Sequence, residues 1–108
     1  MHCLIYHWKL KPGIAEVDFI KNWSEGTRLT YETWGSLGSS LHKATDGTFW
    51  AYARWPSKET RQRMFAERKD WPHPNEPFAD HIGDPLELEL LDDLLAPAPF
   101  NRTNKSEG

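Results

Sequence analysis

A β-hairpin signal in the middle of the chain, followed at once by a helix signal, restricts the fold more than any other feature. Segments 37–44 and 48–55 are typical of two strands, and Asp46-Gly47 lies between them. This pair favours a tight turn because glycine accepts the positive φ that hairpin turns require. Ser57 follows a proline that ends the second strand, and serine is a preferred residue for capping the start of a helix. The sequence therefore predicts strand, turn, strand and helix in direct succession.

The flanking segments complete the pattern. Residues 3–10 alternate and are rich in β-branched and aromatic side chains, which indicates a strand. Residues 14–31 have helical spacing, and residues 58–69 form a second, highly charged helical segment. Leucines alternate with glutamates over 86–90, which indicates a last strand, whereas 78–82 is expected to form one short helical turn.

The predicted order is strand, helix, strand, strand, helix, strand. This is the α+β, ferredoxin-like βαββαβ arrangement, in which two helices cover one face of a four-stranded antiparallel sheet. We expect one domain over residues 1–95 and a C-terminal tail over 96–108, which has no periodicity. Residues 70–77 contain three prolines and are expected to be irregular.

The helical segments differ in how clearly they show an inner face. In the first, Val17, Ile20, Trp23 and Thr27 fall on one stripe, with Phe19 beside it. In the second, only the neighbours Met64 and Phe65 are apolar, and they are expected to face inward. The remaining charged residues of that helix are interpreted as a solvated outer face. They are Lys58, Glu59, Arg61, Arg63, Glu67, Arg68 and Lys69.

Composition excludes several functional classes. The chain has 108 residues and a formal net charge of −3, so it lacks the basic excess that nucleic-acid binders usually carry. The single cysteine, Cys3, cannot form an internal disulfide, which is consistent with a reducing compartment. No apolar run approaches the length of a membrane span, and the first residues lead directly into a strand pattern rather than a signal peptide. We expect a cytoplasmic protein that binds neither nucleic acid nor membrane.

The second hairpin strand has two different faces. Phe49, Ala51, Ala53 and Trp55 share one face, and the two small alanines suit packing beneath helices or the floor of a cavity. Trp50 and Tyr52 lie on the other face, where large aromatic side chains would form an exposed apolar patch, and such patches usually mark an interface. We expect a homodimer formed by packing of this open sheet face, with Trp50, Tyr52, His7 and Leu41 near the two-fold axis.

Several short motifs, in their order and spacing, resemble the antibiotic biosynthesis monooxygenase (ABM) domain family, within the dimeric α/β-barrel group. The resemblance covers about residues 2–92. Its motifs are Lys11-Pro12-Gly13 after the first strand, Gly35-Ser36-Leu37-Gly38-Ser39 at the second, Asp46-Gly47-Thr48 in the hairpin, and Ala53-Arg54-Trp55-Pro56-Ser57 before the second helix. Each motif is structural, and together they indicate the fold rather than one chemistry.

The resemblance implies a homodimer with face-to-face sheets and one pocket per subunit between sheet and helices. Family members include cofactor-independent oxygenases of polycyclic phenols or quinols, and haem-degrading oxygenases. The haem-degrading branch has an Asn, a Trp and a haem-ligating His, and their positions fall on Tyr6, Met64 and Pro74 of this chain, the last beside His73. Haem degradation is therefore disfavoured.

Strand parity and helical spacing together predict one ligand cavity on the helix side of the sheet. The residues expected to bind substrate there are Trp8, Phe19, Trp23, Ala51, Ala53, Met64, Phe65 and Phe78. Tyr6 and His81 are the predicted catalytic residues, because each carries a titratable group suited to a phenolic substrate. The histidines show no metal-binding spacing and no cofactor motif is present, so we expect neither a metal nor a cofactor.

The sequence leaves three functions open. The first is a cofactor-independent monooxygenase-like enzyme acting on a small or polycyclic aromatic, in which the substrate itself supplies the electrons that reduce O2. The second is a non-oxidative cyclase or decarboxylase of aromatic intermediates on the same scaffold. The third is a non-catalytic homodimer that binds an apolar ligand.

Overall fold

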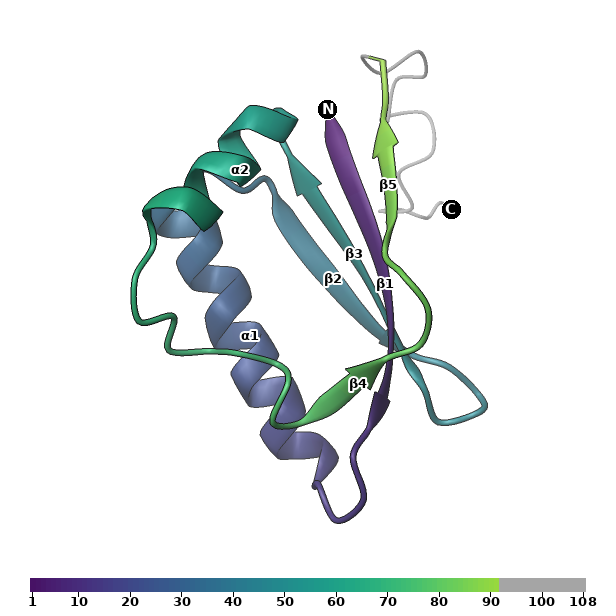
Figure 1. Ribbon diagram of the computed structural model, residues 1–108. Helices are drawn as coiled ribbons and strands as arrows, with labels where there is room; N and C mark the ends of the chain where they lie inside the picture. The colour runs from purple at the N-terminus through teal and green to yellow at the C-terminus, as the bar shows by residue number, and fades with distance from the viewer. Residues whose placement is uncertain (92–108) are drawn as a thin grey trace, which may run out of the picture.

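Two helices and five strands make up the part of the chain that the computed structural model describes, residues 1–91. Residues 92–95 of the predicted domain and the predicted tail lie outside this part. The elements are β1 (His2–Leu10), α1 (Glu16–Thr33), β2 (Gly38–Lys43), β3 (Phe49–Trp55), α2 (Lys58–Glu67), β4 (Ala79–His81) and β5 (Leu86–Glu89) (Figure 1). Neither helix combines the length and the apolar character that crossing a membrane requires.

The strands form one antiparallel sheet in the order β2-β3-β1, and both β4 and β5 pair with the free edge of β1. The predicted ferredoxin-like fold is confirmed, with one correction. Residues 78–82 do not form a helical turn, because β4 pairs with the second half of β1, where His81 lies opposite Trp8. β5 pairs with the first half, where Glu89 lies opposite His2. The fourth position of the sheet is therefore filled by two short strands in succession.

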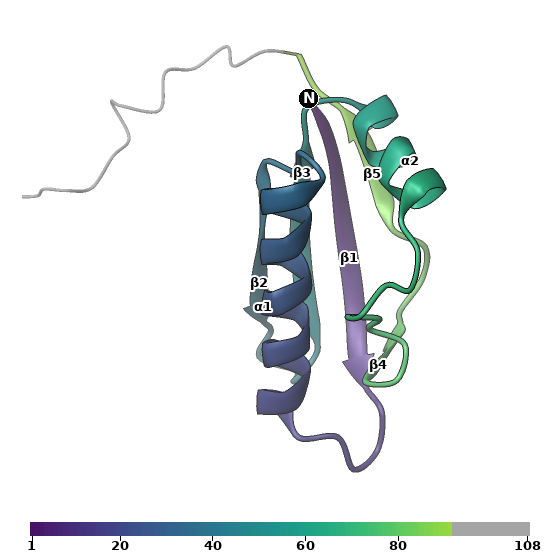
Figure 2. The same cartoon turned by 90° about the vertical axis from the view of Figure 1, so that its left-hand side faces the viewer.

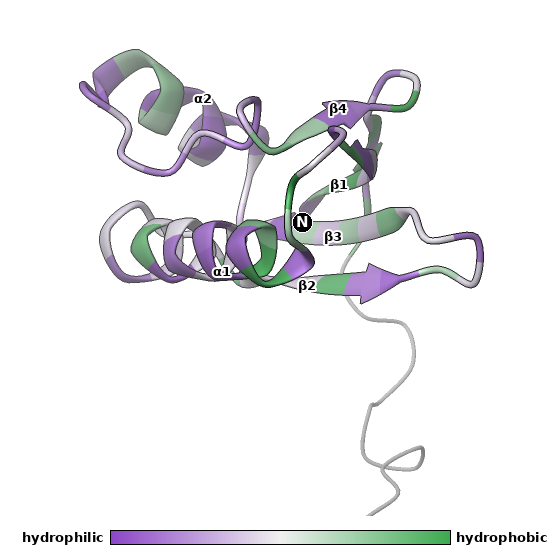
Figure 3. Ribbon diagram, turned by 90° about the horizontal axis from the view of Figure 1, so that it is seen from below, coloured by the Kyte–Doolittle hydropathy of each residue, from purple (hydrophilic) through white to green (hydrophobic). Residues whose placement is uncertain are grey.

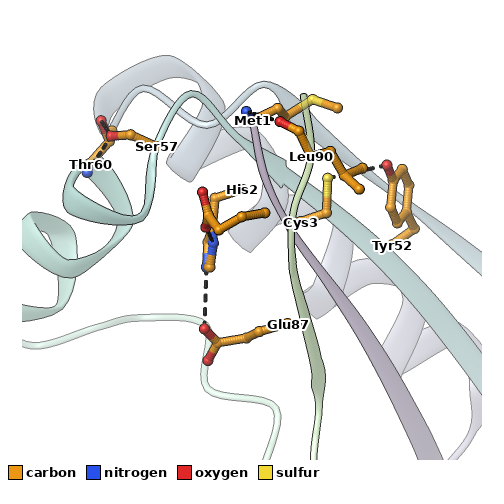
Figure 4. A network of polar contacts seen from close by, with 9 residues as sticks. Met1, His2, Cys3, Tyr52, Ser57, Thr60, Glu87 and Leu90 are labelled. Atoms are coloured by element: carbon orange, nitrogen blue, oxygen red, sulfur yellow. Dashed lines mark hydrogen bonds and ion pairs between the residues drawn. The ribbon is translucent and has the colours of Figure 1, made fainter. Parts of the chain in front are cut away.

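Polar contacts hold these two strands to β1. The backbone N–H of Lys11 donates to the carbonyl of Phe78 at 2.9 Å, and the Lys11 ammonium lies 2.9 Å from the Asp80 carboxylate. At the other end the buried His2 ring contacts Glu89 through Nδ1 and lies 3.5 Å from Glu87 through Nε2 (Figure 4). The strand conformation of β4 thus depends on partners in β1, far away in the sequence, so its three residues alone do not indicate a strand.

The hairpin confirms the predicted turn. Gly47 has φ +87°, and its N–H donates to the carbonyl of Ala44 at 3.0 Å. The Asp46 carboxylate accepts from the backbone N–H and the hydroxyl of Thr48, at 2.9 and 2.6 Å. These hydrogen bonds lower the pKa of Asp46 below its ordinary value.

Helix α1 ends where the sequence supplies a residue free to adopt positive φ. Gly35 has φ +83°, and the N–H groups of Trp34 and Ser36 both donate to the carbonyl of Thr30. This satisfies a carbonyl of the last turn, as helix C-termini require. Helix α2 is capped as predicted by Ser57, whose hydroxyl accepts from the N–H of Thr60 at 3.1 Å (Figure 4).

The predicted inner stripe of α1 is confirmed at Trp23 and Thr27, which are half-buried, and is wrong at Val17 and Ile20. Val17 and Ile20 are 68% and 41% exposed, whereas Phe19 is fully buried and Gly26 is buried. The stripe that faces the sheet therefore runs through Phe19, Trp23 and Gly26, at spacings of four and three residues. The glycine, which reads as a weak point of the helix, lies on its packed side.

Both helices cover the same face of the sheet, here called the helix side (Figures 2 and 3). Pairing register places Tyr6 opposite Ala51 and Leu4 opposite Ala53 on this face. Two separate hydrophobic clusters form there. One is centred on Trp8, Phe19 and Phe49, and the other on Leu4, Trp55 and Met64.

The opposite face carries the predicted aromatic patch. Trp50 is 42% exposed and its ring stacks on His7, with 3.7 Å between centroids, and Leu86 is 53% exposed. Cys3 Sγ lies 3.3 Å from the Tyr52 hydroxyl, and this contact, with burial, raises the pKa of Tyr52 (Figure 4).

Leu41 does not belong to this face, contrary to the expectation for the dimer. It pairs with Ala51 and packs against the Trp8–Phe19–Phe49 cluster on the helix side. The reason is parity, because the β2 residues that share the face of Trp50 and Tyr52 are His42 and Ser40, their partners across the ladder.

The revised stripe of α1 is tested by a pair of truncations. Phe19→Ala removes a fully buried ring that contacts Trp8 and Phe49 edge-on, so we expect the free energy of unfolding to fall by about 3–5 kcal/mol. Val17→Ala truncates an exposed side chain on the same helix and should change it by less than about 0.5 kcal/mol. Urea unfolding followed by circular dichroism measures both. Equal costs would contradict the stripe described here.

Candidate functional site

A cavity of about 340 Å³ lies on the helix side of the sheet, bounded by β1, β3, both helices and the segment that follows α2. Its size is near the lower end of the range for small-molecule pockets, about 300–1,000 Å³. The floor contains Ala51 and Ala53 of β3, as the alternation of that strand predicts. The cavity lies between the two hydrophobic clusters, and Tyr6 packs against both of them.

Aromatic rings from β1 and β4 form one wall. The Tyr6 and Trp8 rings are stacked, with centroids 5.2 Å apart and an interplanar angle of 6°. The His81 ring lies 5.6 Å from Trp8 and 6.1 Å from Tyr6, because β4 places His81 directly opposite Trp8. Strand pairing thus brings together the two predicted catalytic residues, which are 75 positions apart in the sequence.

The segment after α2 closes the cavity on the α1 side. Gly26 allows its close approach, because a Cβ at this position would lie 3.1 Å from His73 Cβ and 3.4 Å from the Trp71 ring. Asn22, one turn earlier on α1, donates through Nδ2 to the carbonyls of His73 and Pro74, at 3.3 and 2.9 Å. It also lies 3.2 Å from Asn75 Oδ1. The proline-rich segment is therefore attached to α1 by a defined set of contacts.

Helix α2 supplies a wall of which the sequence predicted only the apolar residues Met64 and Phe65. Arg61, Met64 and Phe65 of α2 line the cavity together with Arg68, the C-cap residue that follows the helix, although the two arginines were expected on the solvated face. Their spacing of three, four and seven residues from Arg61 is that of a single helix face. Most of this helix is hydrophilic, as the colouring in Figure 3 shows. Its composition therefore gives no sign that one face lines a cavity.

The arginines rest on aromatic rings. The Arg61 guanidinium lies 4.7 Å from the Phe65 ring centroid, and Arg68 lies 4.4 Å from Phe65 and 4.6 Å from Trp71. Arg61 Nη2 also donates to the Tyr6 hydroxyl at 3.4 Å. Burial lowers the pKa of Arg68, and Arg61 lowers it further, while Glu76 and Tyr6 act in the opposite direction.

Most of the predicted site residues meet at this cavity. Eight of the ten line it: Tyr6, Trp8, Trp23, Ala51, Ala53, Met64, Phe65 and His81. Phe19 and Phe78 do not. Phe19 is fully buried in the Trp8–Phe19–Phe49 cluster, and Phe78 packs against that cluster. Both rings therefore fill the core instead of facing the cavity. That these residues bind or transform a ligand stays a prediction.

Sequence reasoning missed the polar lining. Besides Arg61 and Arg68, the cavity is lined by Trp71, Asn75 and Glu76 of the proline-rich segment. The arginines had a detectable signal, namely helical spacing with the apolar pair Met64-Phe65. The individual lining residues of the segment had none, because their placement depends on the contacts of the segment with α1. Among residues 1–91, no group of three or more His, Cys, Asp and Glu side chains is arranged to hold a metal ion.

Comparison with solved structures places this fold among known ones. A cofactor-independent oxygenase, SnoaB from Streptomyces nogalater, superimposes with a TM-score of 0.71 at 12% identity, over 86% of this chain and 95% of its own. A proposed antibiotic biosynthesis monooxygenase from Chloroflexus aurantiacus gives 0.66 at 16% identity, over 85% and 94%. Rv0793 from Mycobacterium tuberculosis gives 0.65 at 15% identity, over 87% and 98%.

These likenesses confirm that the chain has the fold of ABM-type proteins, as its motifs indicate. No protein-family model and no curated protein sequence matches the chain.

The attachment of the proline-rich segment is tested by Asn22→Ala. We expect the hydrogen exchange of the Phe78 and Ala79 amides, which donate to the carbonyl of Asn75, to become about fivefold faster, because loss of the Asn22 contacts lowers the local opening free energy by about 1 kcal/mol. Lys21→Ala is the control, since Lys21 is exposed on the same helix. Unchanged exchange in Asn22→Ala would show that the segment is held by other contacts.

Proposed function

We propose that this chain is a cofactor-independent monooxygenase-like enzyme of the ABM type, acting on a small or polycyclic phenol or quinol. The observation that carries the proposal is the cavity, in which a stacked Tyr6–Trp8 pair and His81 stand over a floor of two alanines. A flat ring system suits such a space, since aromatic rings favour offset stacking on aromatic walls. The likeness in fold to a cofactor-independent oxygenase supports the same chemistry.

The proposed reaction needs no electron source besides the substrate. A bound phenol loses its hydroxyl proton, and the electron-rich anion transfers an electron to O2. The two radicals then combine at a ring carbon that carries hydrogen. Loss of water leaves a quinone carbonyl at that carbon, so one oxygen atom of O2 enters the product and the other leaves as water. The ring C–H and phenolic O–H bonds break, and the substrate is oxidised as O2 is reduced.

Tyr6 and His81 have the proposed proton-transfer roles. Tyr6 presents its hydroxyl inside the cavity, where Arg61 donates to it, and it can hydrogen-bond a substrate oxygen. His81 lines the cavity but is exposed, so a proton that it accepts can pass to solvent. The rings around them exclude water from the reacting carbon, which protects a radical pair from side reactions.

Oxygen uptake tests this proposal. With 1-naphthol and anthrone as probes, we expect one O2 consumed per quinone formed and one ¹⁸O atom from ¹⁸O2 in each product molecule. Tyr6→Phe should lower kcat by about 100-fold or more, the range of a lost acid–base group, with little change in probe affinity. Tyr31→Phe is the matched control, because Tyr31 is 61% exposed outside the cavity. Probes that bind without oxygen uptake would contradict the enzyme and favour the non-catalytic ligand-binding protein.

We further propose that the protein works as a homodimer joined through the open sheet face. The support is the exposed apolar group formed by Trp50, Leu86 and their neighbours on that face. When two sheets pack face to face, such residues are buried in an apolar layer and are no longer exposed to water.

A charge placed at this face tests the dimer. Trp50→Glu should give a monomer by light scattering, because burying a carboxylate between two apolar sheet faces is unfavourable. Val17→Glu is the control, since it puts the same charge on an exposed apolar position on α1, away from the open face. A Trp50→Glu protein that keeps the mass of a dimer would show that the interface lies elsewhere.

A further inference from the structure

Two arginines, Arg61 on α2 and Arg68 at its C-cap, line the cavity. The positions at Arg61, Met64, Phe65 and Arg68 all line the cavity, and such a stripe is normally apolar in a helix that packs on a sheet. Only Met64 of the four is fully buried against the sheet. Arg63 lies on the other side of the same helix and is exposed, as an arginine on a short surface helix usually is.

Neither guanidinium is neutralised by a direct partner. Among residues 1–91, no carboxylate lies within 4.0 Å of Arg61 or Arg68, and the cavity is lined by one carboxylate only, that of Glu76. A guanidinium has five N–H donors, and the side-chain contact of Arg61 with the Tyr6 hydroxyl uses one of them. Two partly desolvated cations with spare donors therefore face the same space.

Stacking fixes how these groups are presented. Arg61 and Arg68 both lie over Phe65, and Arg68 also lies over Trp71. A guanidinium stacked through its face keeps its N–H edge free, and this edge matches the two oxygens of a carboxylate. The burial that lowers the pKa of Arg68 also makes an anionic partner more favourable there than at an open surface.

We infer that the ligand of this cavity is an aromatic carboxylate, bound with its rings over the alanine floor and its carboxylate on Arg61 and Arg68. Two guanidiniums and Glu76 give the lining a net charge of +1, which one carboxylate neutralises. The inference rests on the proposed function only in taking this cavity as the ligand site, and it names the class of compound that the site selects.

Paired probes test the charge requirement. We expect wild-type protein to bind 1-hydroxy-2-naphthoate at least about tenfold more tightly than 1-hydroxy-2-naphthamide, which has the same rings and hydroxyl without the charge, as charge-assisted pairing predicts. Isothermal titration calorimetry at 50 mM salt measures both affinities. The ratio should fall in 500 mM salt, because screening weakens the ion pair. Equal affinities at low salt would overturn the inference.

Variants locate the effect. Arg61→Gln and Arg68→Gln should each reduce the carboxylate-to-amide ratio to about threefold or less, whereas Arg63→Gln, on the exposed side of α2, should keep it. Ala53→Leu should weaken both probes equally, because it fills the floor without changing the charge. Circular dichroism verifies that each variant is folded. A ratio that survives in both inner arginine variants would place the anion elsewhere and overturn the inference.

Oxygen uptake separates this inference from the proposed function. Carboxylate selectivity without O2 uptake would leave the ligand class standing and make the oxygenase wrong. Equally fast O2 uptake with the amide and the carboxylate, together with equal affinities, would support the oxygenase and overturn the ligand class.

Discussion

The side-chain sizes along β3 set the shape of the molecule on its helix side. Phe49, Ala51, Ala53 and Trp55 point to this face in the order large, small, small, large. Phe49 meets Phe19 of α1, and Trp55 packs in one cluster with Met64 of α2, so each helix rests on a bulky residue at one end of the strand. The alanines between them leave space that no residue of 1–91 fills. Protein interiors are close-packed as a rule, so a hollow framed in this way points to a ligand.

This arrangement was largely predictable because its causes are local. Alternation along a strand fixes which residues share a face, and β3 displays its alternation clearly. The residues predicted from β1 and β3 all proved to line the cavity for that reason. β2 contains one apolar side chain and shows no such alternation, so the face of Leu41 follows only from its pairing with Ala51 across the hairpin.

The errors on the helices and at the sheet edge have long-range causes. Hydrophobicity favoured Val17 and Ile20 as the inner stripe of α1, yet Phe19 faces inward on Trp8 and Phe49, and Gly26 faces the proline-rich segment. β4 forms only because nine residues of β1 offer more edge than β5 can pair. Neither the packing on Gly26 nor the pairing of β4 is visible in a window of ten residues, since both depend on partners about 45 or more positions away.

The sheet side of the cavity would contact the rings of a small aromatic acid, and the α2 side would contact its carboxylate. β1 and β4 contribute the stacked rings and the His81 imidazole, while α2 and its C-cap contribute the cationic groups. Figure 2 shows α2 on the same side of the sheet as α1. Arg61 belongs to α2 and Tyr6 to β1, so the hydrogen bond from Arg61 to the Tyr6 hydroxyl connects the helical wall of the cavity to the sheet. Few apolar side chains attach α2 to the sheet, since Met64 is its one buried residue. An anion in the cavity would contact this weakly attached helix. Ligand binding would then stabilise the position of α2, because Arg61, which would bind the anion, lies on the same helix face as Met64, which packs against the sheet.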